Sequence, residues 1–196
     1  MKSKKSNILI INGHPDPESL CSALSAAYME GAMQHPVQIQ RLDLGKMQFE
    51  PNLKFGYRRR TELESDLIEA QELIRRADHL VFVYPTWWGA MPAILKGFID
   101  RIFLPGFAYK YRDNSSMWDK LLTGKSAHLI VTADTPSWYN RLVYKRAGYG
   151  VMKRNILQFC GITPVRVTEF SPINKSSAEQ RTKWLDKAKR LGSKLA

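Results

Sequence analysis

Two adjacent tryptophans, Trp87 and Trp88, stand in a turn between an apolar run and an apolar helix. Pro85 precedes the pair and Gly89 follows it, so both side chains lie in a loop rather than inside a packed element. Loops run over the surface and carry binding residues, and aromatic side chains there can stack on a planar ligand. The alternative is burial in the core or under a partner subunit. The position of the pair favours a site for a planar aromatic molecule.

A second turn, residues 13–19, follows the first apolar run and is rich in turn-forming residues. Ser19 is a suitable N-cap for the helix that we predict over residues 19–34. The free N–H groups of such a helix start bind phosphate. Ser19 would add a hydroxyl, and His14 a donor or a cation. A purely structural loop is the alternative, because any turn between a strand and a helix can be polar.

The turns at residues 13–19 and 85–89 must be positioned by the strands and helices on either side of them, and the sequence pattern predicts that these elements alternate. Unbroken apolar runs predict strands buried on both faces, and alternating runs predict half-exposed strands. The buried runs are residues 7–12, 80–84 and 127–133, and the alternating runs are 37–43 and 164–170. This alternation predicts an α/β fold with a doubly wound parallel sheet.

Further helices are predicted from capping signals and apolar spacing. One runs from Thr61, which forms a capping box with Glu64, to residue 77, and the next runs from Pro92, as its first helical residue, to residue 103. A third covers residues 149–159. The last begins at a cap made by Ser176 and Glu179 and ends at residue 191. Residues 44–60, 106–123 and 134–139 are expected to be irregular.

The half-exposed strands belong at the edges of the sheet, which gives a five-stranded, flavodoxin-like order 2-1-3-4-5 with helices on both faces. Ligands of open α/β sheets bind at the switch point of the strand order, here between the first and third strands. The turns 13–19 and 85–89 should therefore meet at one crevice.

The composition bounds the class of protein. The chain has 196 residues, of which 44% are hydrophobic and 24% charged, as expected for a single domain spanning residues 1–196. No apolar run reaches the roughly 20 residues of a membrane span, and the initial apolar run is too short for a signal peptide. The two cysteines, Cys21 and Cys160, have no metal-ligand spacing, and Cys21 is expected to be structural, with a redox thiol as the alternative. We expect a cytoplasmic protein without a metal centre.

The formal net charge of +12 suits anionic partners such as phosphate cofactors, nucleic acid or an acidic membrane surface. The basic residues form no single stripe, and we expect no nucleic-acid partner. Gly124-Lys125-Ser126 looks like the end of a P-loop, but Asp119 replaces the required first glycine and the segment precedes a strand. The chain also has no dinucleotide fingerprint after its first strand and no Gly-x-Ser-x-Gly hydrolase elbow.

The run PTWWGAMPAILKGFIDRIFLPGFAY, with GHPDPES after the first strand and LLTGKSAHLIVTA into the fourth, resembles the flavodoxin-fold NAD(P)H:quinone oxidoreductases. That family includes mammalian quinone reductases and bacterial relatives, some of them ancillary to potassium-efflux systems. The resemblance covers nearly the whole chain, and P-x-x-W-x-x-x-P-A-I-L-K-G is its most specific segment. It implies a homodimer that holds FMN, with FAD as the alternative. It also implies that NAD(P)H reduces the flavin, which then reduces quinones or similar electrophiles by two-electron hydride transfer in ping-pong order.

The same resemblance assigns residues to the flavin. Its phosphate would be held by His14, Ser19, Leu20 and Cys21. Its ring system would be bordered by Pro85, Thr86, Trp87, Trp88 and Gly89, and its pyrimidine side by Thr132, Ala133, Asp134 and Thr135. Tyr139 matches an active-site tyrosine of the family, so Tyr139 and Trp88 are the catalytic candidates.

The chain departs from the family in three places. Ala133 and Asp134 stand where relatives often have glycines, and the Asp134 carboxylate is expected to point away from the flavin. The mammalian histidine beyond the tyrosine has no counterpart, although Lys145 or Arg146 could replace it electrostatically. The mammalian C-terminal extension has no counterpart either, which favours FMN.

Three rival functions remain from other classes. A flavin-holding regulatory subunit of a membrane transporter, such as a potassium-efflux system, would associate with the membrane peripherally. A nucleic-acid-binding protein is suggested by charge alone. An electron-carrying flavodoxin is disfavoured because that class is typically acidic.

Overall fold

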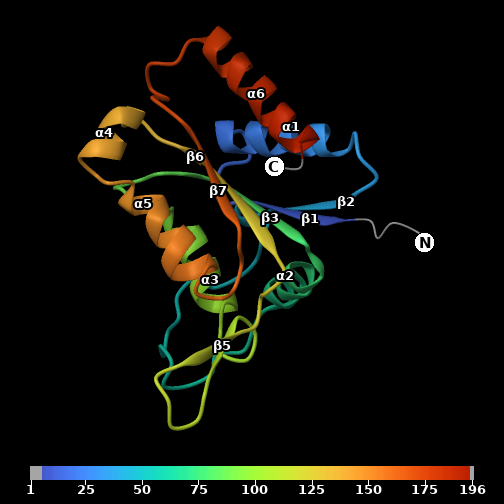
Figure 1. Cartoon of the computed structure of the whole chain (residues 1–196), viewed down its shortest axis with the longest axis vertical. Coiled ribbons are helices and arrows are strands. Elements are labelled where there is room, and N and C mark those ends of the chain that lie inside the picture. Colours follow the sequence, from blue (N-terminus) through green and yellow to red (C-terminus); the bar gives the residue numbers. More distant parts are fainter. Residues whose placement is uncertain (1–5, 195–196) are drawn as a thin grey trace.

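A five-stranded parallel sheet forms the centre of the computed structural model, which describes residues 6–194 (Figure 1). Its strand order is β2-β1-β3-β6-β7, which confirms the predicted order and the doubly wound α/β class. The predicted strand ends differ from the observed ones by at most one residue. The strands are β1 (Asn7–Asn12), β2 (Gln38–Asp43), β3 (His79–Pro85), β6 (Ser126–Thr132) and β7 (Val165–Phe170). As expected, β1, β3 and β6 are almost fully buried, whereas the edge strands β2 and β7 are partly exposed.

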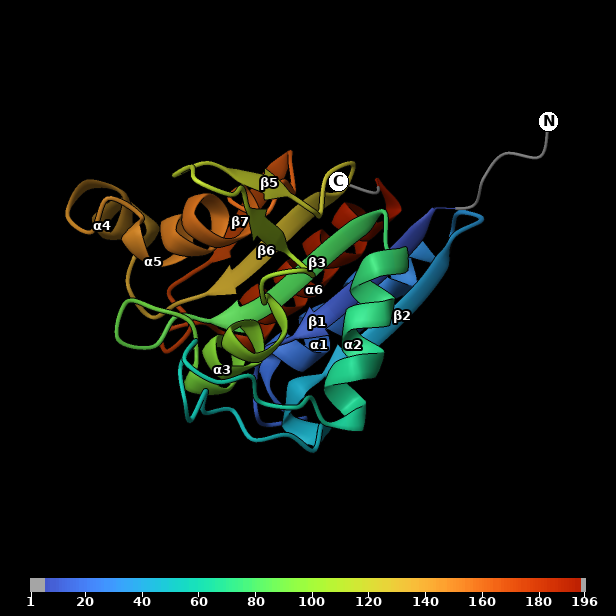
Figure 2. The same ribbon diagram turned by 90° about the horizontal axis from the view of Figure 1, so that it is seen from below.

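Helices cover both faces of the sheet (Figures 1 and 2). One face carries α1 (Leu20–Ala32) and α6 (Ala178–Ser193). The other carries α2 (Ser65–Arg76), α3 (Ala93–Ile102) and α5 (Ala147–Gly150), which continues as a π-helix over Val151–Leu157. Each face has its own hydrophobic cluster. Within residues 6–194, no helix is both long and apolar enough to cross a membrane.

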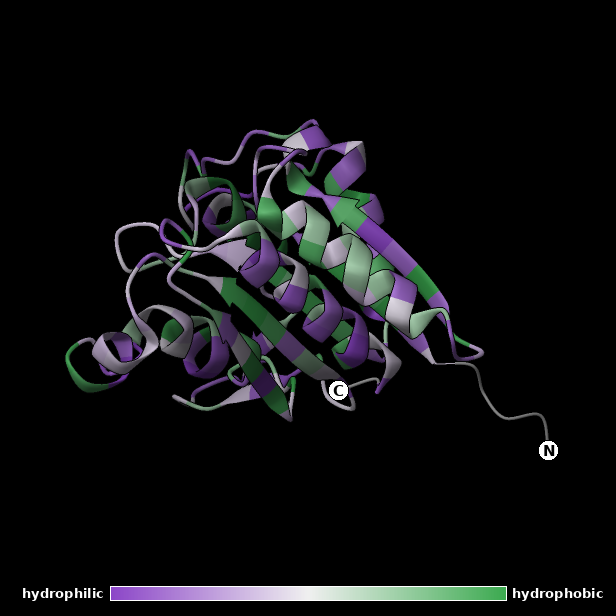
Figure 3. Ribbon diagram, turned by 90° about the horizontal axis from the view of Figure 1, so that it is seen from above, coloured by the Kyte–Doolittle hydropathy of each residue, from purple (hydrophilic) through white to green (hydrophobic). Residues whose placement is uncertain are grey.

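The helices α1 and α6 lie together over the sheet, while α4 (Ser137–Leu142) projects beyond it (Figure 3). The backbones of α1 and α6 are in contact at two glycines. A Cβ on Gly31 would lie 1.9 Å from the Lys189 carbonyl oxygen, and a Cβ on Gly192 would lie 2.0 Å from that of Tyr28. Only glycine permits so close an approach at these positions.

Three predicted helix starts are wrong. The second helix begins at Ser65 rather than Thr61, because the Glu64 carboxylate does not cap it but accepts a 2.8 Å hydrogen bond from Arg101 Nη2. The last helix is capped by Ser177, whose Oγ accepts from Gln180 N at 3.1 Å, because Ser176 Oγ donates to the Ile173 carbonyl instead. Pro92 is the N-cap of α3 and not its first helical residue.

Short elements occur where irregular chain was expected. Residues 106–123 contain an antiparallel hairpin of β4 (Tyr109–Tyr111) and β5 (Trp118–Lys120), and α4 begins within 134–139. A single 3₁₀ turn, Leu44–Lys46, follows β2. The hairpin is held by tertiary packing, since the Trp118 ring stacks on Phe159 with centroids 4.4 Å apart and its Nε1 donates to the Phe159 carbonyl at 3.0 Å.

Arg101 fastens the long segment between β2 and α2 to helix α3. Its side chain is only 1% exposed. Its guanidinium donates to the Glu62 carbonyl and the Glu64 carboxylate, both at 2.8 Å, and also to the Glu50 carbonyl. This segment is therefore ordered by a charge pair whose arginine is buried, although it has little regular structure.

Candidate functional site

The tryptophan turn is a tight two-residue hairpin after β3. Trp87 and Ala90 exchange both backbone hydrogen bonds, at 2.9 and 3.0 Å. Trp88 and Gly89 between them have φ values of 49° and 74°, the conformation of a type I′ turn. This left-handed region costs a non-glycine residue about 1–2 kcal/mol. Trp88 is fully exposed and Trp87 is 45% exposed, which excludes core packing for Trp88.

Helix α5 packs directly against this turn. A Cβ on Gly148 would lie 2.2 Å from the carbonyl oxygen of Gly89. The backbone of the helix start therefore supports the turn that carries Trp88. Nothing in the sequence pattern indicated this contact, because it joins two segments that are far apart in the chain.

A cavity of about 690 Å³, which we call the aromatic cavity, opens between the tryptophan turn, the end of β6 and α5. Among the predicted residues, the cavity is lined by Thr86, Trp87, Trp88, Gly89, Ala133, Asp134 and Thr135. It is also lined by residues that sequence reasoning missed, namely Asn140, Tyr144, Ala147, Gly148 and Tyr149. Its volume lies within the range of small-molecule sites.

A second cavity of about 310 Å³, which we call the helix-start cavity, lies at the N-terminus of α1. Among the predicted residues, it is lined by His14, Ser19, Leu20, Cys21, Pro85, Thr86, Trp87, Thr132, Ala133 and Asp134. The two cavities share Thr86, Trp87, Ala133 and Asp134 and therefore adjoin. The two turns meet at the carboxyl edge of the sheet, as the strand order predicts.

The helix-start cavity presents hydrogen-bond donors. Ser19 is the N-cap of α1, and its Oγ accepts from Ser22 N at 3.3 Å, which leaves the hydroxyl proton free to donate. Within residues 6–194, the backbone N–H groups of Leu20 and Cys21 have no acceptor, as is usual for the first turn of a helix. An anion is the natural ligand for such a group of donors.

His14 adds a neutral donor. Its Nδ1 accepts a 3.0 Å hydrogen bond from Asp16 N, so in the neutral ring the proton is on Nε2. Burial lowers the pKa of His14, and the nearby Asp16 only partly opposes that effect. The imidazole also meets the Trp87 ring edge to face, with centroids 5.3 Å apart, and so links the two turns.

Arg181 of α6 lines the same cavity and was not predicted. Its Nε donates to Ser176 Oγ at 3.0 Å, and its two Nη groups have no other partner in the described chain. The cavity thus has one permanent cation beside its neutral donors and the carboxylates of Asp16 and Asp134. No local motif marks Arg181, since its place depends on how α6 packs on the sheet.

The two cysteines are buried and protonated. Burial raises the pKa of Cys21 to about 11 and that of Cys160 to about 12. Cys21 Sγ lies 3.4 Å from Thr132 Oγ1 and thereby joins α1 to the end of β6. Neither thiol has the low pKa that a reactive cysteine needs. Within residues 6–194, no three His, Cys, Asp or Glu side chains are grouped so as to hold a metal ion.

Four predicted residues lie differently from the rest. Tyr139 lines neither cavity, and its ring instead meets Trp138 and Tyr144 edge to face, with centroids 5.5 and 5.1 Å apart. Asp134 lines both cavities, but its Oδ1 accepts from Asn174 N at 2.8 Å and is thus engaged outside them. Lys145 and Arg146 line a separate groove.

The arrangement as a whole suits a ligand with a flat ring system and a phosphorylated tail. Aromatic side chains stand around one cavity, and helix-start donors with an arginine stand around the adjoining one. A planar ring is held by stacking and by exclusion of water. A phosphate is held by directed N–H and O–H groups.

Known proteins have a similar fold and a related sequence. A family model described as "Flavodoxin-like fold" matches residues 6–194. The ribosyldihydronicotinamide dehydrogenase (quinone) of Rattus norvegicus is 26% identical, and the alignment covers 97% of this chain and 93% of that protein. The crystal structure of Smu.1420 from Streptococcus mutans UA159 is 34% identical with a TM-score of 0.82, over 96% of this chain and 99% of that one. The NAD(P)H:quinone oxidoreductase from Methanothermobacter marburgensis is 26% identical with a TM-score of 0.82, over 97% of each chain. The chain therefore belongs to the flavodoxin-like fold family, with homologues named as NAD(P)H:quinone oxidoreductases.

Proposed function

We propose that this protein is an FMN-dependent NAD(P)H oxidoreductase that reduces quinones or similar electrophiles. The observation that carries the proposal is the junction of the aromatic and helix-start cavities along the ends of β3 and β6. The names of the homologues supply the reaction class, since they include quinone-reducing dehydrogenases.

The helix-start cavity fits the phosphate of FMN. The N–H groups of Leu20 and Cys21, the Ser19 hydroxyl and His14 Nε2–H are neutral donors, and Arg181 supplies a positive charge. A phosphate prefers this combination of directed donors and a cation. The neutral state of His14 leaves Arg181 as the cation that would set the affinity.

The aromatic cavity fits the ring system of FMN and the partner that stacks on it. Trp87, Trp88, Tyr144 and Tyr149 form aromatic walls. The N–H groups of Trp88 and Gly89 donate to no acceptor within the described residues and are available to a ring carbonyl or nitrogen. These residues would orient the ring and keep water from it. FMN, when bound, supplies two-electron transfer between NAD(P)H and the acceptor.

Both substrates would use the aromatic cavity in turn, which corresponds to ping-pong order. Tyr139 stays a proposed catalytic residue. Its ring packs on that of Tyr144, and Tyr144 lines the cavity, so Tyr139 would act through Tyr144. No protein side chain needs to transfer electrons. The part of the protein is orientation and exclusion of water.

The test is to purify the protein, record its visible spectrum and identify the released chromophore by chromatography. We expect FMN, and excess FMN at about 100 times its dissociation constant should stabilise the apoprotein by roughly 2.7 kcal/mol. Initial rates with NAD(P)H and a quinone should give parallel double-reciprocal lines. A colourless protein that FMN and FAD fail to stabilise would contradict the proposal. A flavin-loaded protein without quinone turnover would instead favour the regulatory subunit of a transporter.

We also propose a homodimer, because large apolar side chains remain exposed around the aromatic cavity. Those on and after α4 are Trp138, Leu142, Val143 and Tyr144, each at least half exposed. A second copy of the chain would cover them and would also narrow the cavity mouth beside Trp88. Light scattering at micromolar concentration should give twice the 22.5 kDa mass of the chain, and a monomer would contradict this part.

A further inference from the structure

A third cavity, of about 780 Å³, lies along the exposed edge strand β7 beside α5 and the π-helix. We call it the basic groove. Its cationic lining residues are Lys145, Arg146, Lys153, Arg154 and Arg166. Along the chain the basic residues look scattered, but the fold gathers these five in one place.

The basic groove adjoins the aromatic cavity. Tyr149 lines both. Asn140, which lines the aromatic cavity, donates at 2.7 Å to Glu169, which lines the groove. A ligand that stacks in the aromatic cavity and reaches into the groove would pass Tyr149.

Lys145 and Arg146 occupy the mouth of the groove in a strained conformation. Their φ values are 49° and 58°, in the left-handed region that non-glycine residues avoid. Each such residue costs on the order of 1–3 kcal/mol, and strain of this kind concentrates at functional sites. Two consecutive strained residues, both cationic, are unexpected in a loop that only connects α4 to α5.

The charge of the groove is not neutralised from within. Among the described residues, none of its five cations forms an ion pair with a carboxylate. Glu169 is its one acidic lining residue, and both of its oxygens are engaged, one by Asn140 Nδ2 and the other by Ser171 Oγ at 3.1 Å. The groove is therefore prepared for a ligand with several negative charges.

We infer that the basic groove binds the phosphate groups of NADPH and makes the enzyme prefer NADPH to NADH. The inference rests on the proposed function, since the nicotinamide end must occupy the aromatic cavity. Lys145 and Arg146, next to that cavity, would meet the pyrophosphate. The 2′-phosphate, which is present only in NADPH and carries about −1.5 to −2 charges, would meet Arg154 and its neighbours.

The spacing of the cations fits an extended dinucleotide. Arg146 is the N-cap of α5, and Arg154 lies eight residues further along the chain on the π-helix that continues α5, so about two helical turns separate the two cations. The guanidinium of Arg154 lies back over Gly150, where a Cβ would be 2.8 Å from its Nη2. The planar fork of arginine also suits a phosphate monoester better than a lysine does.

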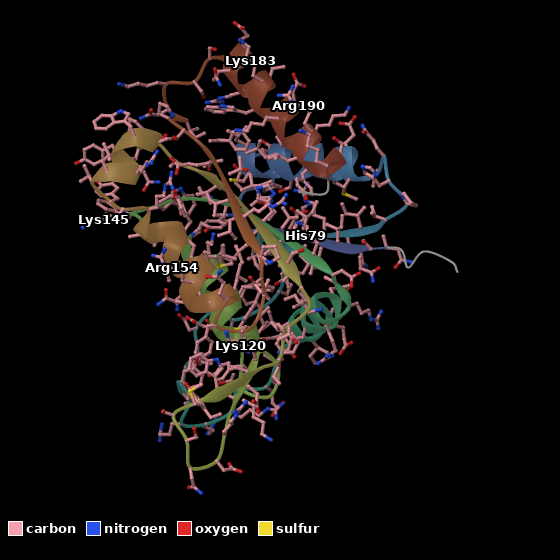
Figure 4. The ribbon with its side chains drawn as sticks, in the orientation of Figure 1. His79, Lys120, Lys145, Arg154, Lys183 and Arg190 are labelled. Atoms are coloured by element: carbon pink, nitrogen blue, oxygen red, sulfur yellow. The ribbon has the colours of Figure 1, made fainter. Side chains whose placement is uncertain are left out.

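The test compares the ratio of kcat/KM for NADPH to kcat/KM for NADH in the wild-type holoprotein and in two variants. Arg154→Gln should lower this ratio about tenfold, the loss expected when a charge-assisted phosphate contact is removed. Lys120→Gln is the control, because Lys120 lies on β5 of the β4–β5 hairpin and does not line the groove (Figure 4). It removes the same charge and should leave the ratio unchanged.

Calorimetry with adenosine 2′,5′-bisphosphate and 5′-AMP tests the groove without turnover. The bisphosphate should bind about tenfold more tightly than 5′-AMP, and Arg154→Gln should abolish the difference. Inorganic pyrophosphate should bind more weakly than the bisphosphate, and equal affinity would reduce the groove to a general anion site and overturn the inference. Equal kcat/KM for NADPH and NADH in an active wild-type enzyme would overturn it too, while the proposed function would stand. If the protein holds no flavin, the proposed function fails, and calorimetry still decides whether the groove recognises the 2′-phosphate.

Discussion

Trp88 has its side chain entirely in solvent at the tip of a turn whose backbone favours glycine. A residue that gains nothing from packing and strains its own backbone contributes nothing evident to the stability of the monomer. Its exposed ring is explained if it covers a ligand in the aromatic cavity. The adjacent tryptophans were recognisable in the sequence because an aromatic pair between a proline and a glycine is unusual. The left-handed conformation of Trp88 was not recognisable in the sequence, because asparagine or glycine is the usual residue at such a position.

Replacing Trp88 by glycine should separate strain from function. We expect Trp88→Gly to leave the free energy of unfolding unchanged or to raise it by about 1 kcal/mol, because glycine adopts positive φ without penalty. The same variant should lower kcat/KM for quinones at least tenfold, about 1.4 kcal/mol, through the lost aromatic wall. Urea unfolding and quinone kinetics on one preparation measure both. Trp88→Phe is the control that keeps a ring, and it should retain most of the activity. Wild-type kinetics in Trp88→Gly would show that the ring has no role at the site.

Arg181 could not be recognised as a site residue from the sequence. It lies in an ordinary charged helix, and only the packing of α6 brings it to the helix-start cavity. We expect Arg181→Gln to weaken FMN binding about tenfold, since one charge-assisted contact to phosphate is lost. Lys183→Gln, two residues further on and ion-paired with Glu179 at 2.6 Å, is the control and should bind FMN normally. Fluorescence titration of the apoproteins gives both dissociation constants. Equal constants would remove Arg181 from the phosphate site.

At the scale of elements, the sequence predicted the five strands and their order but not the short elements. Long apolar runs define buried strands because such runs cannot be placed anywhere else. The β4–β5 hairpin has three-residue strands, and α4 has only six residues. Elements this short carry no period, and contacts such as Trp118 on Phe159 decide their form. The capping box predicted at Thr61 does not form for a related reason: the Glu64 carboxylate accepts a hydrogen bond from the buried Arg101 of α3 instead.

The contact between α5 and the tryptophan turn predicts the effect of adding a side chain at Gly148. Gly148→Ala would place a methyl group 2.2 Å from the Gly89 carbonyl oxygen, so either the helix or the turn must move. We expect a loss of about 1–3 kcal/mol in the free energy of unfolding. We also expect lower quinone reductase activity, because the turn that carries Trp88 shifts. Gly150→Ala is the control for stability, since there the methyl group meets only the flexible end of Arg154. Equal stability of the two variants would show that the turn does not rest on the helix.

For the whole molecule, buried histidines link stability to pH. His79 stands at the start of β3, where its Nδ1 lies 2.8 Å from Ser126 Oγ and its Nε2 lies 3.4 Å from the Tyr28 hydroxyl. Burial lowers the pKa of His79 to about 4, and electrostatic interactions with His128 and Arg166 act in the same direction. In the unfolded chain the ring takes up a proton below about pH 6.5, whereas the native ring stays neutral until about pH 4.

Stability should therefore fall as the pH decreases from about 6.5 to 4, with His79 contributing about 3 kcal/mol to that loss. The contribution is fully present above pH 6.5. Urea unfolding at pH 7, 5.5 and 4.5 measures it, and His79→Gln should show a shallower decline even if it is less stable at pH 7. An unchanged pH slope in that variant would assign the acid sensitivity to other groups.

The position of α6 has a consequence for how the protein is made. This helix comes last among the described elements, yet it packs on α1, the first helix, through glycine-to-backbone contacts and also carries Arg181. On the ribosome, the apolar face of α1 must stay uncovered until α6 has emerged. A nascent chain can form the strands and the tryptophan turn earlier, but it cannot yet place Arg181 at the helix-start cavity. Capture of the proposed cofactor would then require that α6 has been synthesised, and a chain truncated before α6 would be left exposed to chaperones and proteases.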